Sequence, residues 1–298
     1  MDIRHWIAAG LMTTVVVVSV PPASAAWPGQ NGRIAFARDP GTKNLDLWSA
    51  RSNGADEVQL TDAPSTEFEA SQSPTSKRVV YSAFIDTSYE ICRLTNSGDC
   101  LQLTDSEPWD RTPAFSSDGE KIVWVRDGEL YKMNADGSRK RRLVDLAGTE
   151  NAPVWSPEGN RIAFHRQLPS GQSEIFTIKP NGNDLRRITR NNVDDGSPDW
   201  HPTQDVLVWS REDPSTSDDW EIVKKSLAPG SPVRFLTNSP QGEGNPSYSP
   251  NGEKIAYDRF SPSDSFDVYV MNANGSDEHA VVDTPMRDYD PYWLLAAD

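Results

Sequence analysis

Short apolar runs rich in β-branched and aromatic residues recur along the chain, each bounded by turn-forming glycine, asparagine, serine or proline. The most regular run has aliphatic residues followed by an aromatic one, and most of its copies begin with lysine or arginine. The copies lie at residues 33–36, 78–81, 121–124, 161–164, 206–209 and 254–257. Their spacing of about 40 to 48 residues matches one four-stranded propeller blade. The pattern predicts six repeats of one β-rich unit.

Each repeat also carries the signals of three further strands. A second run opens with an acid and an aliphatic residue, as at 46–48, 129–131 and 267–269. A turn follows at 53–54, 97–98, 136–137, 181–182, 229–230 or 274–275. Each of these turns contains glycine, which supplies the positive φ that tight hairpins need. A third short strand then leads through a loop into a strand that usually contains proline, so the predicted fold class is all-β.

A fuller motif appears at residues 153–164 and 246–257: proline, an aromatic residue, Ser-Pro, an acid or amide with glycine, a basic residue and aliphatic residues. This motif resembles the WD40-like (PD40) repeat of TolB-like propellers, and the resemblance covers residues 27–295. It implies a six-bladed β-propeller with four-stranded blades and a protein-binding role in the cell envelope. Repeat two departs most from it, with Ala70 and Gln72 where proline and the aromatic residue belong. TolB proteins carry another domain before the propeller, and we expect this chain to lack it.

The two ends of the repeat region predict how the ring closes. The first repeat begins at Asn31 and Gly32, just after the place of a first strand, and residues 290–295 form a first strand without a repeat behind it. We expect this C-terminal strand to complete the first blade. Closure of the ring removes the exposed sheet edges that promote aggregation.

The N-terminus is typical of an export signal. Arg4 and His5 precede an apolar run from Trp6 to Val20, and an Ala-Ser-Ala site ends at Ala25. The run is shorter than the roughly 20 residues that span a bilayer. We therefore predict a signal peptide at 1–25, one propeller domain at 26–298, no membrane span, and a secreted or periplasmic protein.

Two cysteines flank the turn at residues 96–98, one on each arm of a predicted hairpin. Disulfides persist in exported proteins. No histidine lies near them to complete a zinc site. We expect Cys92 and Cys100 to be bonded to each other.

An acid stands three positions before the proline position in every repeat. First strands line the tunnel of a propeller, so these acids are expected to ring one mouth as a ligand site: Glu67, Asp110, Glu150, Asp195, Glu243 and Asp288. A ring of carboxylates suits an axial Ca²⁺ or Mg²⁺, although we expect no other cofactor. The alternative is a structural role, in which each acid caps backbone amides or pairs with a basic group of a neighbouring blade.

A second set of acids lies at the start of the third predicted strand of each blade, counted from the tunnel: Asp46, Glu90, Glu129, Glu174, Glu221 and Asp267. An arginine lies across the preceding loop in every repeat except the second, where Ala83 takes its place. Residues 126–129 form a tight hairpin that sets Arg126 opposite Glu129. We expect cross-strand ion pairs here, each stabilising by about 1 kcal/mol or less.

Variable loops on the face of the first acid ring are candidates for partner binding, because a rigid ring presents them outside the constraint of the repeat. They carry aromatic and arginine side chains, which anchor protein interfaces. The candidates are Phe68, Trp109, Arg111, Arg190, Trp220, Arg287 and Tyr289. The alternative for Trp109 and Tyr289 is packing between blades.

The net charge of −15 argues against a nucleic acid partner, which needs a basic face. The sequence contains no nucleophile elbow, no His-Glu-x-x-His motif and no phosphate-binding loop. We therefore expect a non-catalytic, monomeric scaffold that binds a protein or peptide at one face. The alternative is a metal-dependent small-molecule enzyme or sugar-binding propeller similar to six-bladed lactonases.

Overall fold

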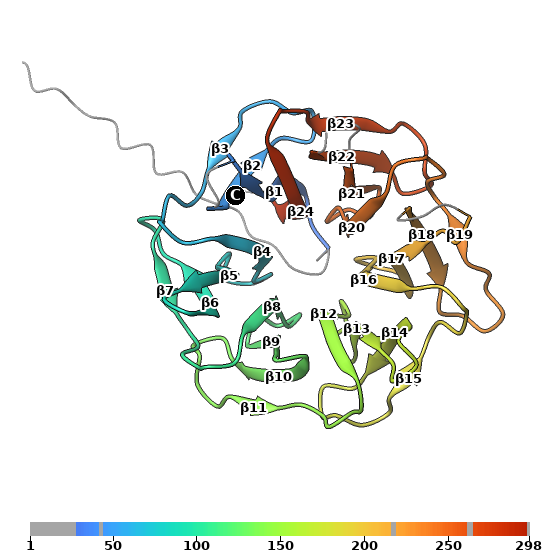
Figure 1. Ribbon diagram of the computed structural model, residues 1–298, viewed down its shortest axis with the longest axis horizontal. Helices are drawn as coiled ribbons and strands as arrows, with labels where there is room; N and C mark the ends of the chain where they lie inside the picture. The colour runs from blue at the N-terminus through green and yellow to red at the C-terminus, as the bar shows by residue number, and fades with distance from the viewer. Residues whose placement is uncertain (1–27, 42–43, 216–218, 261–264, 297–298) are drawn as a thin grey trace, which may run out of the picture.

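The computed structural model describes residues 28–41, 44–215, 219–260 and 265–296. Its strands form six sheets of four antiparallel strands each, arranged as blades around a central axis (Figure 1). The predicted six-bladed, all-β propeller is confirmed. The predicted signal peptide at 1–25 lies outside the described residues. In the described part of the chain no helix has the length and apolar character that a membrane crossing needs.

The blades are numbered by the order of their repeats, and their strands are given from the axis outward. Blade 1 contains β24 (Arg287–Leu295), β1 (Asn31–Asp39), β2 (Asp46–Ala50) and β3 (Val58–Gln59). Blade 2 contains β4 (Glu67–Gln72), β5 (Val79–Ile85), β6 (Ser88–Leu94) and β7 (Cys100–Gln102). Blade 3 contains β8 (Asp110–Phe115), β9 (Lys121–Arg126), β10 (Glu129–Asn134) and β11 (Arg141–Arg142).

The other three blades follow the same order. Blade 4 contains β12 (Thr149–Trp155), β13 (Ile162–Gln167), β14 (Ser173–Ile178) and β15 (Arg186–Arg187). Blade 5 contains β16 (Asp195–Trp200), β17 (Val206–Glu212), β18 (Trp220–Ser226) and β19 (Arg234–Phe235). Blade 6 contains β20 (Glu243–Tyr248), β21 (Lys254–Phe260), β22 (Phe266–Asn272) and β23 (His279–Val282).

Blade 1 joins the two ends of the chain, as the sequence predicts. The C-terminal strand β24 pairs antiparallel with β1, and Trp293 lies opposite Ile34 in this pairing. Both side chains are buried in a cluster that also includes Val268 of blade 6. The C-terminal strand therefore supplies the innermost strand of blade 1 and part of the packing against blade 6.

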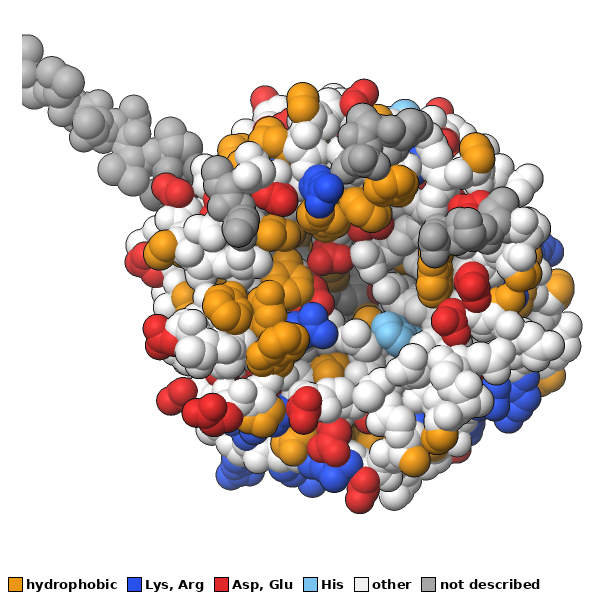
Figure 2. All heavy atoms as spheres, in the orientation of Figure 1, with side chains coloured by type: hydrophobic (Ala, Val, Ile, Leu, Met, Phe, Trp, Pro, Cys, Tyr) orange, Lys and Arg blue, Asp and Glu red, His pale blue; other side chains and the backbone are white. Residues whose placement is uncertain are grey.

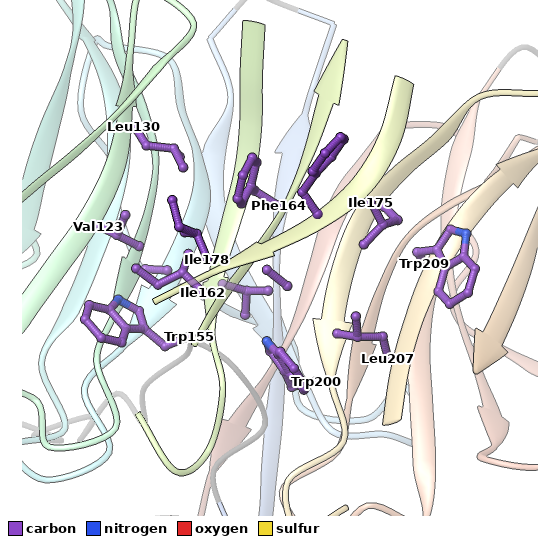
Figure 3. Close-up of a cluster of buried hydrophobic side chains, with 14 of the residues drawn as sticks. Val123, Leu130, Trp155, Ile162, Phe164, Ile175, Ile178, Trp200, Leu207 and Trp209 are labelled. Carbon is purple, nitrogen blue, oxygen red and sulfur yellow. The ribbon is translucent and has the colours of Figure 1, made fainter. Parts of the chain in front are cut away.

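The hydrophobic core lies between neighbouring blades, because each blade presents apolar side chains from both faces of its sheet. The largest cluster spans blades 3, 4 and 5 and includes Trp155, Phe164, Trp200 and Trp209 (Figure 3). Burying a large apolar side chain stabilises a fold by about 1.5 to 3 kcal/mol. The ring is therefore held together by contacts between its repeats as well as within them.

The predicted disulfide is confirmed: Cys92 of β6 is bonded to Cys100 of β7. The bond crosses the hairpin between these two strands, where Leu94 lies opposite Cys100. It ties the short outermost strand of blade 2 to its neighbour.

The innermost strands share a local distortion. The residue two positions after each acid of the first ring has a φ between 46° and 56° in all six blades: Glu69, Thr112, Ala152, Ser197, Asn245 and Asp290. The pairing of each innermost strand with its neighbour shifts at this point, as between Gly196 and Asp199. Proline follows in five of the blades, and proline fits such a bulge because it has no N–H to donate.

The closure of blade 1 generates a testable prediction. Truncation after Met286 removes β24 and leaves the inner edge of β1 unpaired, and it also removes Trp293 from the contact with blade 6. We expect a protein that aggregates or loses most of its thermal stability, compared with a control that lacks only residues 297–298. Size-exclusion chromatography and thermal unfolding measure the effect, and a monomeric truncation with the melting temperature of the control would contradict it.

Candidate functional site

The first acid ring lies inside the blades. All six carboxylates belong to residues with at most 2 % exposure, and none of the six lines the axial cavity. Five of them face an arginine of the second strand of their own blade, and the closest N–O distance in the ion pair is 2.7 Å for Asp110, Asp195 and Asp288. The expectation that the ring converges on the axis is wrong, because the bulge that follows each acid turns its side chain into the blade.

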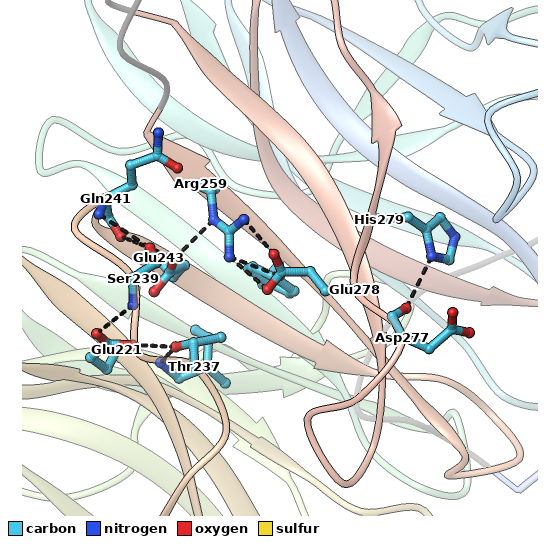
Figure 4. A network of polar contacts seen from close by, with 11 residues as sticks. Glu221, Thr237, Ser239, Gln241, Glu243, Arg259, Asp277, Glu278 and His279 are labelled. Carbon is cyan, nitrogen blue, oxygen red and sulfur yellow. Dashed lines mark hydrogen bonds and ion pairs between the residues drawn. The ribbon is translucent and has the colours of Figure 1, made fainter.

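The environment of each paired acid is a network of charged and aromatic groups. Asp110 also accepts an indole N–H from Trp124 at 2.8 Å, and Asp195 accepts one from Trp209 at 2.6 Å. In blade 6, Arg259 contacts Glu243 at 2.9 Å and Glu278 at 2.6 Å (Figure 4). These contacts fix the orientation of the second strand against the first.

Two members of the ring are less well compensated. Glu67 lies opposite Ala83, and burial raises the pKa of Glu67 to about 7. Arg166 is 3.6 Å from Glu150, and burial raises the pKa of Glu150 to about 7. Glu150, Asp195 and Glu243 also line two side pockets that are described below. A ligand-binding role for members of the ring therefore stays a prediction.

The second set of acids serves a different purpose from the one expected. Arg126 lies opposite Glu129 in the strand register, yet its ion pair is with Asp110, and Glu129 pairs with Arg142 instead. In other blades these acids accept backbone N–H groups of the loop that leaves the outermost strand, as Glu90 does from Ser106 at 3.0 Å. They hold the connections between blades in place.

An axial cavity of about 260 Å³ lies at the centre of the ring, where Figure 2 shows a hollow. The bulged residues of all six innermost strands line it: Glu69, Thr112, Ala152, Ser197, Asn245 and Asp290. These positions differ from blade to blade, so the cavity is chemically asymmetric although the backbone repeats. We call the face onto which it opens the mouth.

Carboxylates gather on one side of this cavity. Asn245 donates through Nδ2 to Asp258 at 2.9 Å and to Asp290 at 2.8 Å. Burial raises the pKa of Asp290 well above its usual range, and the nearby carboxylates of Glu69 and Asp258 raise it further. Arg111 partly opposes this shift, so the cavity has an excess of acidic groups over bases.

His165 occupies the opposite wall. Its Nδ1 accepts the backbone N–H of Ser197 at 3.1 Å, and burial lowers the pKa of His165 to about 4. The imidazole is therefore neutral at physiological pH. Ser197 donates its hydroxyl to Asn245 Oδ1 at 2.8 Å, which leaves no hydrogen bond from the serine hydroxyl to the histidine.

A cluster of aromatic side chains belongs to blades 2 and 3. Tyr89 makes edge-to-face contacts with Phe68, Phe84 and Trp109 at centroid distances of 5.1 to 5.4 Å. Arg111 lies within 6 Å of the rings of Tyr89 and Trp109. The predicted partner-binding residues Phe68, Trp109 and Arg111 thus form one cluster with the aromatic rings of Tyr89 and Phe84. Trp109 is 52 % exposed and Phe84 is 38 % exposed.

The remaining loop candidates are distributed over other blades. Trp220 lines a pocket between blades 5 and 6, and the ring of Tyr289 lies 5.1 Å from the ring of Phe266, which lines the same pocket. Arg287 is exposed at the start of β24, and Arg190 donates to the backbone carbonyl of Arg187 in its own loop. Trp220 and Tyr289 therefore lie near the mouth, and Arg190 is a loop-stabilising residue.

Two side pockets open beside the axial cavity. One lies between blades 3 and 4 and has a volume of about 390 Å³, and the other lies between blades 5 and 6 and has a volume of about 580 Å³. His165 lines all three cavities. The three therefore form one continuous concave surface across the mouth.

Metal-binding potential in the described residues is limited to one group of three close acids, Asp213, Asp219 and Glu221. None of the three lines the axial cavity. Glu221 already accepts the hydroxyl of Thr237 and the backbone N–H of Ser239. The expectation of an axial Ca²⁺ or Mg²⁺ stays a prediction.

Six four-stranded blades around an asymmetric axial cavity define a six-bladed β-propeller with one concave, aromatic-lined face. The chain belongs to the TolB β-propeller family: the family model of the TolB beta propeller domain, PD40, matches residues 30–295. The resemblance inferred from the repeat motif is therefore confirmed.

Solved structures agree on the fold. TolB from Acinetobacter baumannii superposes with a TM-score of 0.78 at 19 % identity, over 89 % of this chain and 67 % of that one. A putative TolB from Agrobacterium tumefaciens superposes with a TM-score of 0.69 at 15 % identity, over 88 % and 98 % of the two chains. At these identities the likeness concerns the fold alone.

Sequence relatives match shorter stretches. An uncharacterized protein of Agrobacterium fabrum, Atu1656, is 29 % identical over 141 residues, which are 42 % of this chain and 48 % of that protein. Dipeptidyl-peptidase 5 of Porphyromonas endodontalis is 36 % identical over 87 residues, 26 % of this chain and 12 % of the peptidase. The chain thus spans less than half the length of these relatives.

The sequence interpretation missed the residues that line the cavity. They lie in two positions of the repeat: the bulged residue, which lines the axial cavity, and the residue before the second-strand arginine, which lines one or more of the three cavities as Val125, His165, Ser210 or Asp258 in four of the blades. The available signal was that these positions vary in polarity while their neighbours repeat. The acids of the first ring were chosen as a candidate site because they recur in every repeat. Residues that recur in every repeat stabilise the blades in this fold.

The pairing of the ring acids generates a stability prediction. Asp195→Asn removes the partner of Arg211 in a buried ion pair and is expected to lower the free energy of unfolding by about 3 kcal/mol. Glu67→Gln removes an acid whose pKa burial raises, so it is expected to leave stability equal or higher at pH 8. Urea unfolding of both variants against the wild type measures these changes.

The pH dependence follows from the same group. Because the folded-state pKa of Glu67 lies near 7, above the ordinary 4.5, its contribution to stability is present below pH 4.5 and lost as the pH rises through 7. Glu67→Gln should therefore lose less stability than the wild type between pH 5 and pH 8. Equal losses in the two proteins would show that Glu67 is ionised with its usual pKa.

Proposed function

We propose that this protein is a non-catalytic binding scaffold that holds a peptide segment of a partner protein on the mouth. The observation that carries the proposal is the continuous concave surface formed by the axial cavity and its two side pockets, which meet at His165. A surface of this shape can receive several consecutive side chains. The blades that frame it form a closed, rigid ring.

The aromatic cluster supports a protein partner. Exposed aromatic residues and arginine are the residue types that dominate binding energy at protein interfaces. Trp109 is about half exposed although Tyr89 and Arg111 contact it, so its face is available in a fixed orientation. An exposed aromatic side chain that is already ordered loses little conformational entropy on binding.

Two features favour binding over catalysis. The Nδ1 atom of His165 accepts a backbone N–H, so it is not free to accept a proton from a substrate. Burial lowers the pKa of His165 to about 4, which makes it a weak base at neutral pH. Dipeptidyl-peptidase 5 matches in 87 residues only, about an eighth of its own length. The catalytic function named for that protein is thus compatible with a binding role for the propeller of this chain.

An exported location is part of the proposal. The Cys92–Cys100 disulfide supports it, since such bonds persist in oxidising compartments and are rare in reducing ones. The family membership and the N-terminal sequence are consistent with an extracytoplasmic binding protein.

Selection from a random peptide library tests the proposed function. We expect the wild-type protein to enrich peptides whose affinity falls about tenfold or more in the double variant Trp109→Ala, Arg111→Ala. Phe235→Ala is the matched control, because Phe235 is 57 % exposed and lies on the outermost strand of blade 5. Calorimetric titration with the selected peptides measures the affinities. The proposal would be contradicted if the selected peptides bound the double variant with the same affinity as the wild type and the control variant.

A further inference from the structure

The pocket between blades 5 and 6 has the features of a specific subsite. Its volume of about 580 Å³ lies in the range of small-molecule sites. Trp220, Phe260 and Phe266 contribute aromatic walls, and Ser210, Asn245 and Asp258 contribute polar groups. Phe260 contacts Phe266 at a centroid distance of 5.2 Å, so part of the wall is a fixed pair of rings.

The pocket exists because two blades have glycine where the others have larger side chains. Gly196 and Gly244 lie opposite Ser210 and Asp258 in their sheets. The equivalent positions of blades 1, 2, 3 and 4 carry Tyr289, Phe68, Arg111 and Asn151. A Cβ on Gly244 would lie 2.7 Å from Asp258 Oδ1, so glycine is required for this aspartate to occupy its place.

The floor of the pocket contains polar groups that are buried without full compensation. Ser210 is 5 % exposed, and its hydroxyl has no hydrogen-bond partner among the described residues. Asp258 is 2 % exposed and accepts hydrogen bonds from Asn245 and from the backbone N–H of Asp290. An unpaired buried hydroxyl beside a buried carboxylate indicates a ligand that donates hydrogen bonds.

The described residues that line the pocket include three acids and no lysine or arginine. One of these acids, Asp258, adjoins Asp290 across Asn245. Asp195 and Glu243 also line the pocket, but arginines already pair with them. A cation bound here would favour the ionised forms of Asp258 and Asp290, and the faces of the aromatic rings would also attract it.

We propose that this pocket binds an arginine side chain of the peptide ligand. A guanidinium is planar, stacks on aromatic rings and donates several hydrogen bonds, so it matches the Trp220 and Phe266 walls and the Asp258 and Ser210 floor together. The inference rests on the proposed function in that the arginine belongs to the peptide held at the mouth. It adds a specificity: the peptide is basic at this position.

A pair of small probes tests the subsite without knowledge of the partner. Nα-acetyl-arginine amide is titrated into protein with ¹⁵N-labelled indoles, and Nα-acetyl-citrulline amide is its uncharged counterpart of similar shape. We expect the indole resonance of Trp220 to shift saturably with the arginine probe, about tenfold more tightly than with citrulline. Trp220→Phe assigns the resonance.

Two variants test the geometry. Asp258→Asn is expected to remove the preference for arginine over citrulline, and Glu253→Gln, an exposed acid in the turn after β20, is the matched control that retains it. Gly196→Leu is expected to abolish binding by filling the pocket. A Cβ at Gly196 meets His165 and Trp220 at 3.8 to 3.9 Å, an ordinary contact, so this variant should fold even if Asp258→Asn does not.

Equal binding of the two probes by the wild type, or unchanged arginine binding in Gly196→Leu, would overturn the subsite. A preference for neutral sugars in the same titration would also overturn it. Failure of the peptide selection at the mouth contradicts the proposed function separately, because the probes report on the blade 5–6 pocket even when no peptide binds.

Discussion

The bulge in the innermost strand of each blade is the constraint on which the site depends. In a regular strand, residues two positions apart point to the same face. Here the residue two positions after each ring acid adopts a positive φ and shifts the register, as Asn245 does after Glu243. The acid therefore turns into the blade toward its arginine, and the bulged residue faces the axis. The bulge thus places the ring acid in the blade, where it contributes to stability, and the residue two positions later in the cavity wall.

This division explains how a symmetric scaffold carries an asymmetric site. The buried acid–arginine pairs recur in five blades because each blade needs the same connection between its first two strands. The cavity positions have no such shared task, so they hold a glutamate in blade 2, an alanine in blade 4 and an aspartate in blade 1. The carboxylates, the neutral histidine and the aromatic walls then lie on different sides of one concave surface. Such an arrangement can fix both the position and the direction of a bound chain.

Much of the fold could be predicted from the sequence because its determinants are local and repeated. Turn glycines, β-branched runs and the spacing of the motif defined six blades, and the unmatched strand at the C-terminus defined the closure of blade 1. The site was less accessible, because period-two alternation assigns Glu67 and Glu69 to the same face and the bulge separates them. The ion pair of Arg126 could not be predicted from the strand register, because Arg126 lies opposite both Glu129 and Asp110 and can pair with either. The side pocket between blades 5 and 6 depends on the missing side chains of Gly196 and Gly244 in two neighbouring blades, so it cannot be predicted from one repeat alone.

If the variable positions of the repeat form the binding surface, a peptide obtained by selection should bind there, and a crystal structure of the complex decides this. We expect the peptide to cross the mouth and to contact residues of the two variable positions, among them Glu69, His165 and Asp258. A peptide bound along an outermost strand such as β7 or β19, or at the opposite end of the ring, would contradict it.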